Sequence, residues 1–147
     1  MDCIKIPSGE ITNKPLLEFI SQFDIPVIMS TGMADLSDIE SAIDVLSHHR
    51  LTRENISILH CTSQYPAGMK DINLLAIPSM RKKFDLDIGY SDHTIGAEAA
   101  IAAVSLGATI IEKHITLDCS MTGPDHKASM EPNDFKAMIS AIRNIEA

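Results

Sequence analysis

The chain has 147 residues, the length of one domain, and a chain of this size buries roughly two-thirds of its unfolded surface. Its formal net charge is −8, and its 12 basic residues are scattered, so neither a nucleic acid nor an anionic membrane is an expected partner. No apolar run reaches the roughly 18 residues of a membrane helix. The three cysteines have no metal-ligand spacing, and together these features predict a cytoplasmic protein.

Strands and helices alternate along the predicted chain. Short, β-branched apolar runs at 3–6, 26–30, 56–60, 87–91 and 109–114 indicate five strands. Amphipathic segments at 13–23, 35–49, 97–107 and 131–146 indicate helices, and the basic run 81–83 is expected to end another. This alternation predicts repeated βαβ units around a parallel sheet. Five units cannot close an eight-stranded barrel, so the sheet is open or the chain belongs to a longer protein.

Polar and ionisable side chains that could bind a ligand or take part in a reaction gather where the predicted strands end. In parallel α/β folds this edge of the sheet binds ligands, in closed barrels and in open sheets alike. The residues at this edge are Lys5, Ser8, Glu10, Ser30, Thr31, Gly32, Thr62, Ser63, Tyr65, Ser91, Asp92, His93 and His114.

Two histidines follow neighbouring strands, His93 after the fourth and His114 at the end of the fifth. Adjacent parallel strands lie about 4.8 Å apart, so two such imidazoles can share one ion. Imidazole suits a divalent transition metal, and an incomplete ligand set leaves room for water and substrate oxygen. Two ordinary loop histidines are the alternative, and spacing alone does not separate the two readings.

Two loops are candidate anion sites. Lys5, Ser8 and Glu10 surround a glycine turn, and the sequence STGM (30–33) precedes a predicted helix whose N-terminus favours phosphate. Simple N-capping explains the hydroxyls of STGM alone equally well, but the pair of Lys5 and Ser8 beside it favours an anionic ligand. Cys61 follows His60 and has the chemistry of a nucleophile, although a free cysteine is more often a small buried residue. A further polar loop, GPDHKASMEP (123–132), contains Asp125.

Six ordered motifs resemble the sialic acid synthase family, whose N-acetylneuraminate and legionaminate branches are the most similar. They are KIPSGEITN, STGMA, LHCTSQYP, GYSDHT, EKHITLD and GPDHKASMEP. The resemblance implies an α/β fold, a partial (β/α)8 TIM barrel of about five βα units. It assigns residues 1–147 to the central and later part of that barrel. The family's N-terminal barrel units and C-terminal antifreeze-like domain would then be absent.

The resemblance also implies a reaction, in which phosphoenolpyruvate condenses with an N-acyl hexosamine to give a nonulosonic acid and phosphate. It makes His93 and His114 catalytic ligands of a divalent ion, with Mn²⁺ expected before Mg²⁺ or Co²⁺. Glu10 and Asp125 match catalytic positions near the sugar and the metal, and Glu10 would stabilise cationic character or take a proton. Substrate-binding roles fall on Lys5, Ser8, Ser30, Ser63, Tyr65 and Ser91, and Ser63 stands where some members have Asn.

The motif GPDHKAS favours N-acetylmannosamine as the sugar, with 2,4-diacetamido-2,4,6-trideoxymannose second. The family resemblance implies a homodimer for the full-length enzyme. One alternative is a truncated, catalytically silent fragment that folds or assembles only with the missing barrel units, because a half barrel exposes two sheet edges. A barrel metal hydrolase is another, but it would need a denser set of ligands than the sequence offers.

Overall fold

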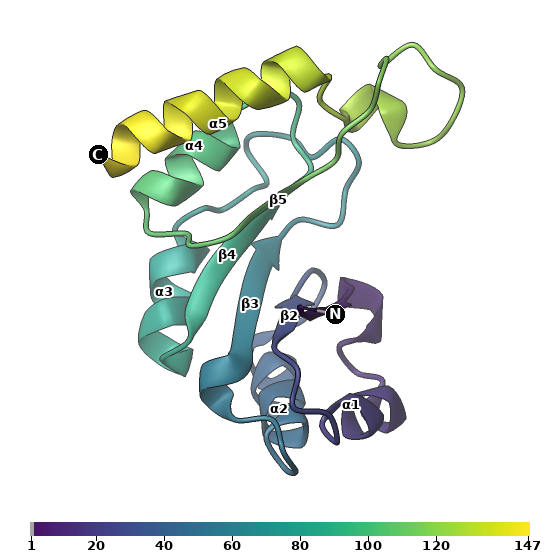
Figure 1. Cartoon of the computed structure of the whole chain (residues 1–147), viewed down its shortest axis with the longest axis vertical. Helices are drawn as coiled ribbons and strands as arrows, with labels where there is room; N and C mark the ends of the chain where they lie inside the picture. Colours follow the sequence, from purple (N-terminus) through teal and green to yellow (C-terminus); the bar gives the residue numbers. More distant parts are fainter. Residues whose placement is uncertain (1) are drawn as a thin grey trace.

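The computed structural model describes residues 2–147, which contain one parallel sheet of five strands in the order β1-β2-β3-β4-β5. The strands are β1 (Ile4–Ile6), β2 (Val27–Ser30), β3 (Ile56–Cys61), β4 (Asp87–Asp92) and β5 (Ile111–Lys113). Each strand pairs with the next one along the chain, as in a barrel wall (Figure 1). All five predicted strands are confirmed, and the two at the sheet edges are three residues long.

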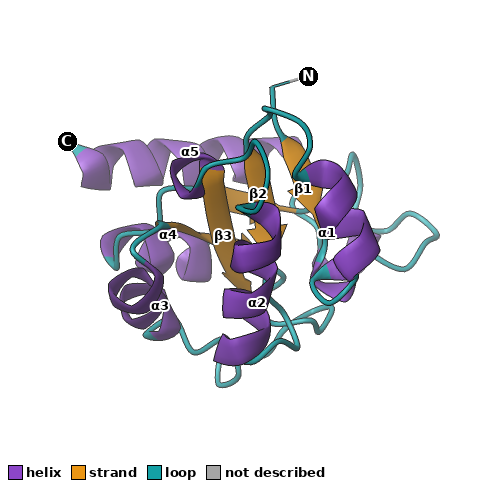
Figure 2. Ribbon diagram, turned by 90° about the horizontal axis from the view of Figure 1, so that it is seen from below, coloured by secondary structure: helices purple, strands orange, loops and turns teal. Residues whose placement is uncertain are grey.

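Helices connect the strands and lie in an arc outside the sheet (Figure 2). They are α1 (Lys14–Ile20), α2 (Leu36–Leu46), α3 (Ala76–Phe84), α4 (Glu98–Ser105) and α5 (Pro132–Glu146), with 3-10 turns η1 (Ser8–Glu10), η2 (Arg53–Asn55) and η3 (His126–Ala128). Asn13 caps α1, and Asp35 forms a capping box with Asp38 at the start of α2. No helix within residues 2–147 is long and apolar enough to cross a membrane.

One helix was predicted only by its last turn. The basic run 81–83 does end a helix, α3, whose chain then turns through Asp85 in the left-handed conformation. Pro78 obscures the start of α3 in the sequence, but it lies in the first turn, where proline removes no intrahelical hydrogen bond. The start of α3 therefore had no distinct sequence signal.

The main hydrophobic core lies between the sheet and its helices. Met29, Ile58 and Ile88 from the strands are fully buried in one cluster with Ile43 of α2 and Ile77 of α3. Because side chains alternate along a strand, the neighbours of these residues point to the other, concave face of the sheet. At the carboxyl ends of the strands, that concave face is polar.

The sheet is strongly curved. Lys5 is in β1 and Glu112 is in β5, the two edge strands, yet Lys5 Nζ lies 3.5 Å from Glu112 Oε2. In a flat sheet, four strand spacings of about 4.8 Å would separate the two backbones by roughly 19 Å, which is farther than these side chains span. The structure is therefore a curled half barrel, which confirms the partial (β/α)8 barrel expected from the sequence.

Gly89 tests the packing of the concave face. A methyl group added there would overlap Leu59 Cδ2 and lie 2.6 Å from the Ile110 carbonyl oxygen, which belongs to the backbone and cannot move aside. Gly89→Ala is expected to lower the free energy of unfolding by about 2 kcal/mol or more, as overpacking does. The measurement is urea denaturation. Gly9→Ala is the matched control, because nothing lies within 4 Å of the added methyl, and an equal loss in both variants would contradict the prediction.

Candidate active site

A hydrogen-bonded chain crosses the concave face at the carboxyl edge of the sheet. Lys5 Nζ donates to Ser30 Oγ at 2.8 Å and faces Glu112 across the half barrel. Ser91 Oγ in turn donates to Glu112 Oε1 at 2.7 Å. Three residues expected to bind substrate, Lys5, Ser30 and Ser91, are thus joined through one carboxylate. The ammonium and the hydroxyls lie where an anionic ligand would meet them together.

A second group of polar atoms surrounds Gly32, directly after β2. The Gly32 N–H donates to Ser8 Oγ at 2.9 Å, and Ser8 Oγ lies 3.2 Å from the buried Cys61 Sγ. The direction in which a Gly32 side chain would project is occupied by Ser63 Oγ, Ser8 Oγ and Cys61 Sγ. The structure therefore brings Ser8 and Ser63 together around a position that only glycine leaves open.

The two candidate metal ligands face each other. The ring centroids of His93 and His114 are 5.6 Å apart with an interplanar angle of 75°. Tyr65 packs against both, with its ring centroid 4.0 Å from that of His93 and 5.5 Å from that of His114. The predicted residues Tyr65, His93 and His114 thus form one cluster, although they come from three different loops or strand ends.

Hydrogen bonds fix the orientation and the tautomer of His93. Its Nδ1–H donates to the Thr62 carbonyl at 2.7 Å, which leaves the lone pair of Nε2 for a ligand. Ser91 Oγ lies 3.3 Å from Nε2, but the serine hydroxyl is directed to Glu112. Burial lowers the pKa of His93, and the neighbouring His114 lowers it further, against the opposing effect of the Thr62 carbonyl. His93 is therefore neutral at pH 7, as a metal ligand must be.

The pair fits a divalent ion in part. An imidazole nitrogen binds such an ion at about 2.1 Å, so two imidazoles on one ion have ring centroids roughly 4.5–6.5 Å apart. The observed 5.6 Å lies in this range. Within the described part of the chain, however, no group of three or more His, Cys, Asp or Glu side chains is arranged to hold an ion. His93 and His114 would leave the remaining positions to water or substrate oxygens.

Glu10 and Asp125 are less closely connected to the other predicted site residues. Glu10 Oε2 accepts a hydrogen bond from Asn13 at 2.6 Å, within its own turn. Asp125 is exposed in the loop before η3. Burial raises the pKa of Tyr65, and the Cys61 thiol and the charges of Asp125 and Glu112 raise it further, so Asp125 does act on the cluster electrostatically. These contacts do not test the catalytic roles expected of Glu10 and Asp125, which stay predictions.

Two contributors, Glu112 and Lys113, were missed from the sequence. Glu112 connects Lys5 to Ser91. Asp92 was expected at the ligand-binding edge, but its side chain is fully buried in an ion pair of 2.8 Å with Lys113, on the other face of the sheet and directly before the two histidines. The alternation of side chains along β4 and β5 was the available signal, because it places Glu112 on the same face as Ser91 and His93, and Asp92 and Lys113 on the opposite one.

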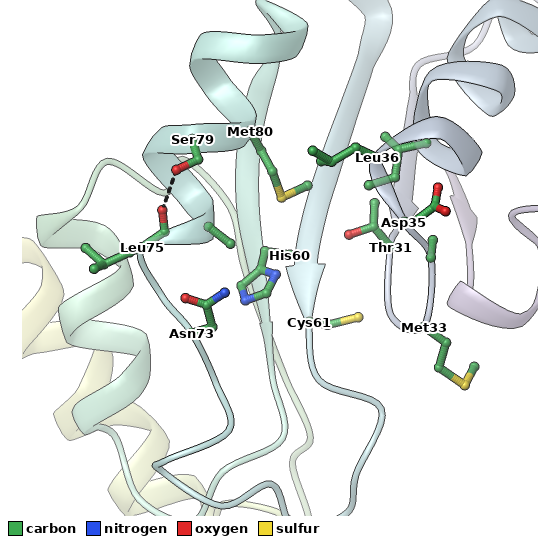
Figure 3. Close-up of a pocket in the computed structure, with 13 residues that line it drawn as sticks. Thr31, Met33, Asp35, Leu36, His60, Cys61, Asn73, Leu75, Ser79 and Met80 are labelled. Carbon is green, nitrogen blue, oxygen red and sulfur yellow. Dashed lines mark hydrogen bonds between the residues drawn. The ribbon is translucent and has the colours of Figure 1, made fainter.

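His60 and Cys61 do not form a nucleophile–base pair. His60 Nε2–H donates to the Ile72 carbonyl at 2.7 Å, whereas Cys61 is buried beside Ser8. Both line a cavity of about 560 Å³ between the starts of α2 and α3 (Figure 3). The walls of this cavity are largely apolar, with Leu36, Leu75 and Met80 among them. It is separate from the cluster of His93 and His114.

A curled parallel sheet whose carboxyl edge combines an ammonium, hydroxyls and imidazoles defines a segment of a (β/α)8 barrel with its ligand-binding end. Comparison with known proteins identifies the segment further. The family model described as "NeuB family" matches residues 1–147. The chain belongs to the NeuB family.

Named relatives are similar along nearly the whole chain. The N,N'-diacetyllegionaminic acid synthases of Campylobacter jejuni and Legionella pneumophila are 53% and 46% identical, each over 97% of this chain. The crystal structure of the N-acetylneuraminic acid synthetase of Leptospira borgpetersenii superimposes with a TM-score of 0.93 at 37% identity, over 99% of this chain and 50% of that one. The chain spans only 42% and 41% of the two legionaminic acid synthases.

The lowered pKa of His93 predicts a pH dependence of stability. Below the usual histidine pKa of about 6.5, the unfolded chain binds a proton that the folded chain does not, so stability falls as the pH falls through this range. In urea denaturation with a chelator present, the loss of unfolding free energy between about pH 7.5 and about pH 5.5 should be smaller in His93→Gln than in the unsubstituted chain. Equal losses would show that the His93 pKa is not lowered.

Proposed function

We propose that the protein containing this chain condenses phosphoenolpyruvate with an N-acyl hexosamine to form a nonulosonic acid and phosphate. The observation that carries the proposal is the carboxyl edge of the sheet, where Lys5, Ser30 and Ser91 are joined through Glu112 beside two facing imidazoles. Membership of the NeuB family supports it. The relatives, which include sialic, legionaminic and pseudaminic acid synthases, support this one class of reaction.

The reaction has a simple balance of bonds. C3 of phosphoenolpyruvate forms a bond to the aldehyde carbon of the open-chain sugar, water adds to C2, and phosphate leaves as the C2–O bond breaks. The aldehyde oxygen takes a proton and becomes the new hydroxyl. The water oxygen becomes the C2 carbonyl oxygen of the open-chain product, and the second proton of the water leaves with the phosphate. Lys5 with the hydroxyls of Ser8, Ser30 and Ser91 would hold the anionic groups of phosphoenolpyruvate, and this fixed orientation lowers the entropic part of the barrier.

Charge develops at two places during this reaction, C2 of phosphoenolpyruvate and the aldehyde oxygen of the sugar. Glu10 would stabilise cationic character at C2 or accept a proton from the attacking water, and Asp125 would orient the sugar. A divalent ion, Mn²⁺ before Mg²⁺ or Co²⁺, supplies a Lewis acid that polarises the aldehyde oxygen when bound. His93 through Nε2 and His114 would hold that ion. Tyr65 packs against both rings and limits their rotation.

The relatives reorder the candidate sugars. The sequence favoured N-acetylmannosamine, but the relatives from Campylobacter jejuni and Legionella pneumophila, at 53% and 46% identity, are N,N'-diacetyllegionaminic acid synthases. The N-acetylneuraminate-9-phosphate synthases of Drosophila melanogaster and Homo sapiens are 40% and 36% identical. We therefore place 2,4-diacetamido-2,4,6-trideoxymannose first and N-acetylmannosamine second. The homodimer stays a prediction.

Activity is tested on protein purified from its own cells with an antibody against this chain. Phosphate release and the nonulosonic acid product are measured with phosphoenolpyruvate, Mn²⁺ and each sugar in turn. We expect turnover in the purified protein, and kcat/KM at least tenfold higher for the trideoxy sugar. Absence of turnover with both sugars would contradict the synthase proposal. The 147-residue chain, assayed alone, distinguishes an active segment from a silent one.

Substitution of the two histidines tests the metal role. In the active protein, His93→Ala and His114→Ala should each reduce Mn²⁺-dependent turnover at least a hundredfold, because each removes one of the proposed ligands. The far-ultraviolet circular dichroism should remain unchanged. His49→Ala is the control, since His49 is exposed beyond the C-terminal end of α2. Full turnover in either ligand variant would rule out the assignment of the ion to these residues.

Gly32→Ala tests the anion-binding loop separately. The added methyl would occupy the space between Ser8 Oγ, Cys61 Sγ and Ser63 Oγ, which are side-chain ends that can shift without unfolding the chain. We expect the free energy of unfolding to change by less than about 1 kcal/mol, while KM for phosphoenolpyruvate rises at least tenfold. Steady-state kinetics measures this, with Gly9→Ala as the control. An unchanged KM would exclude this loop from the phosphoenolpyruvate site.

A further inference from the structure

A buried ion pair lies directly behind the two facing histidines. Asp92 and Lys113 are the last pair in the register between β4 and β5, and His93 and His114 directly follow the ends of these two strands. Both side chains of the pair are 0% exposed and approach to 2.8 Å. Because side chains alternate along a strand, the pair lies on the helix side of the sheet and the imidazoles on the concave side.

The pair fixes the backbone on both sides of His93. Lys113 Nζ donates to Asp92 Oδ2 and also to the carbonyl oxygen of Thr94, at 2.5 Å. Asp92 Oδ1 accepts hydrogen bonds from the Thr94 N–H at 2.9 Å and from its hydroxyl at 2.7 Å. The residues before and after His93 are therefore tied to the residue before His114. This tie compensates for the shortness of β5, which has three residues to hold its register.

Stability alone is a weak reason for such a pair. Desolvation of two charges offsets most of their attraction, and replacement of a buried ion pair by neutral side chains of similar size is often neutral or stabilising. We propose that Asp92 and Lys113 are positioning residues, which hold the ends of β4 and β5 so that the His93 and His114 imidazoles face one point. The use of that geometry for a divalent ion rests on the proposed function.

The test variant is Asp92→Asn/Lys113→Met in the 147-residue chain. It removes both charges, preserves the approximate volumes and leaves an amide oxygen that can still accept from Thr94. The probe is Mn²⁺ alone, followed by paramagnetic broadening of the imidazole resonances in NMR spectra. Loss of second-shell partners typically costs 10–100-fold in metal affinity, so we expect affinity at the His93–His114 site to fall at least tenfold. The matched control is Glu40→Gln/Lys83→Met, which removes an exposed ion pair of 3.3 Å.

A second readout needs no metal. At a pH where histidine is neutral, long-range ¹H–¹⁵N spectra should show His93 as the Nδ1–H tautomer, because Nδ1 donates to the Thr62 carbonyl. In the double variant we expect a mixture of tautomers, with a melting temperature within a few degrees of the original. The single variant Lys113→Arg keeps a positive charge and N–H donors opposite Asp92. It should keep the single tautomer of His93, with a Mn²⁺ affinity within threefold of that of the unsubstituted chain.

The outcomes separate this inference from the proposed function. If the unsubstituted chain shows the single tautomer but no Mn²⁺ broadening at either histidine, the metal role fails and positioning of His93 stands. If it binds Mn²⁺ and the double variant binds equally well with the same tautomer, positioning is overturned and the metal role stands. Should the double variant not fold, Thr94→Val removes one donor to Asp92, and unchanged Mn²⁺ affinity in that variant overturns the inference.

Discussion

Curvature of the five-stranded sheet is the constraint on which the site depends. The helices α1 to α4 pack on one face only and leave the other face concave, so that Lys5 of the first strand meets Glu112 of the last. This partly exposed ion pair contributes little to stability. Its importance is geometric, because the same curvature that permits it brings chemically active residues from five separate units to one edge.

The alternation of side chains along each strand then gives the two faces of the sheet different roles, the core on one and the polar site on the other. Toward the helices the strands present Met29, Ile58 and Ile88, which form the core. Toward the concave face they present hydroxyls, the Lys5 ammonium and the Glu112 carboxylate near their carboxyl ends. At the end of β4 polar side chains alternate between the two faces in the same way, since Asp92 points to the helix side and His93 to the concave side. A buried charge pair and a candidate metal ligand thus occupy consecutive residues.

Local patterns predicted the strands well and the functional network only in part. The runs were recognisable because β-branched residues were bounded by polar loops, and Asn13 and Asp35 formed the helix caps at α1 and α2. Ser8, Ser30 and Ser91 were placed at the correct edge because parallel strands all end there. Glu112 escaped notice because its partners, Lys5 and Ser91, are 107 and 21 residues away in the sequence, and no local spacing connects them.

The sequence by itself determined the alternation of strands and helices, the edge that carries the polar residues and, through its ordered motifs, the family. These properties are local or follow from the order of the elements along the chain, so that short-range patterns in the sequence are sufficient to predict them. Only the tertiary structure decided the curvature of the sheet, the burial of the Asp92–Lys113 pair and the tautomer of His93. Each of these arises from contacts between residues far apart in the sequence, whose distance depends on how tightly the sheet curls.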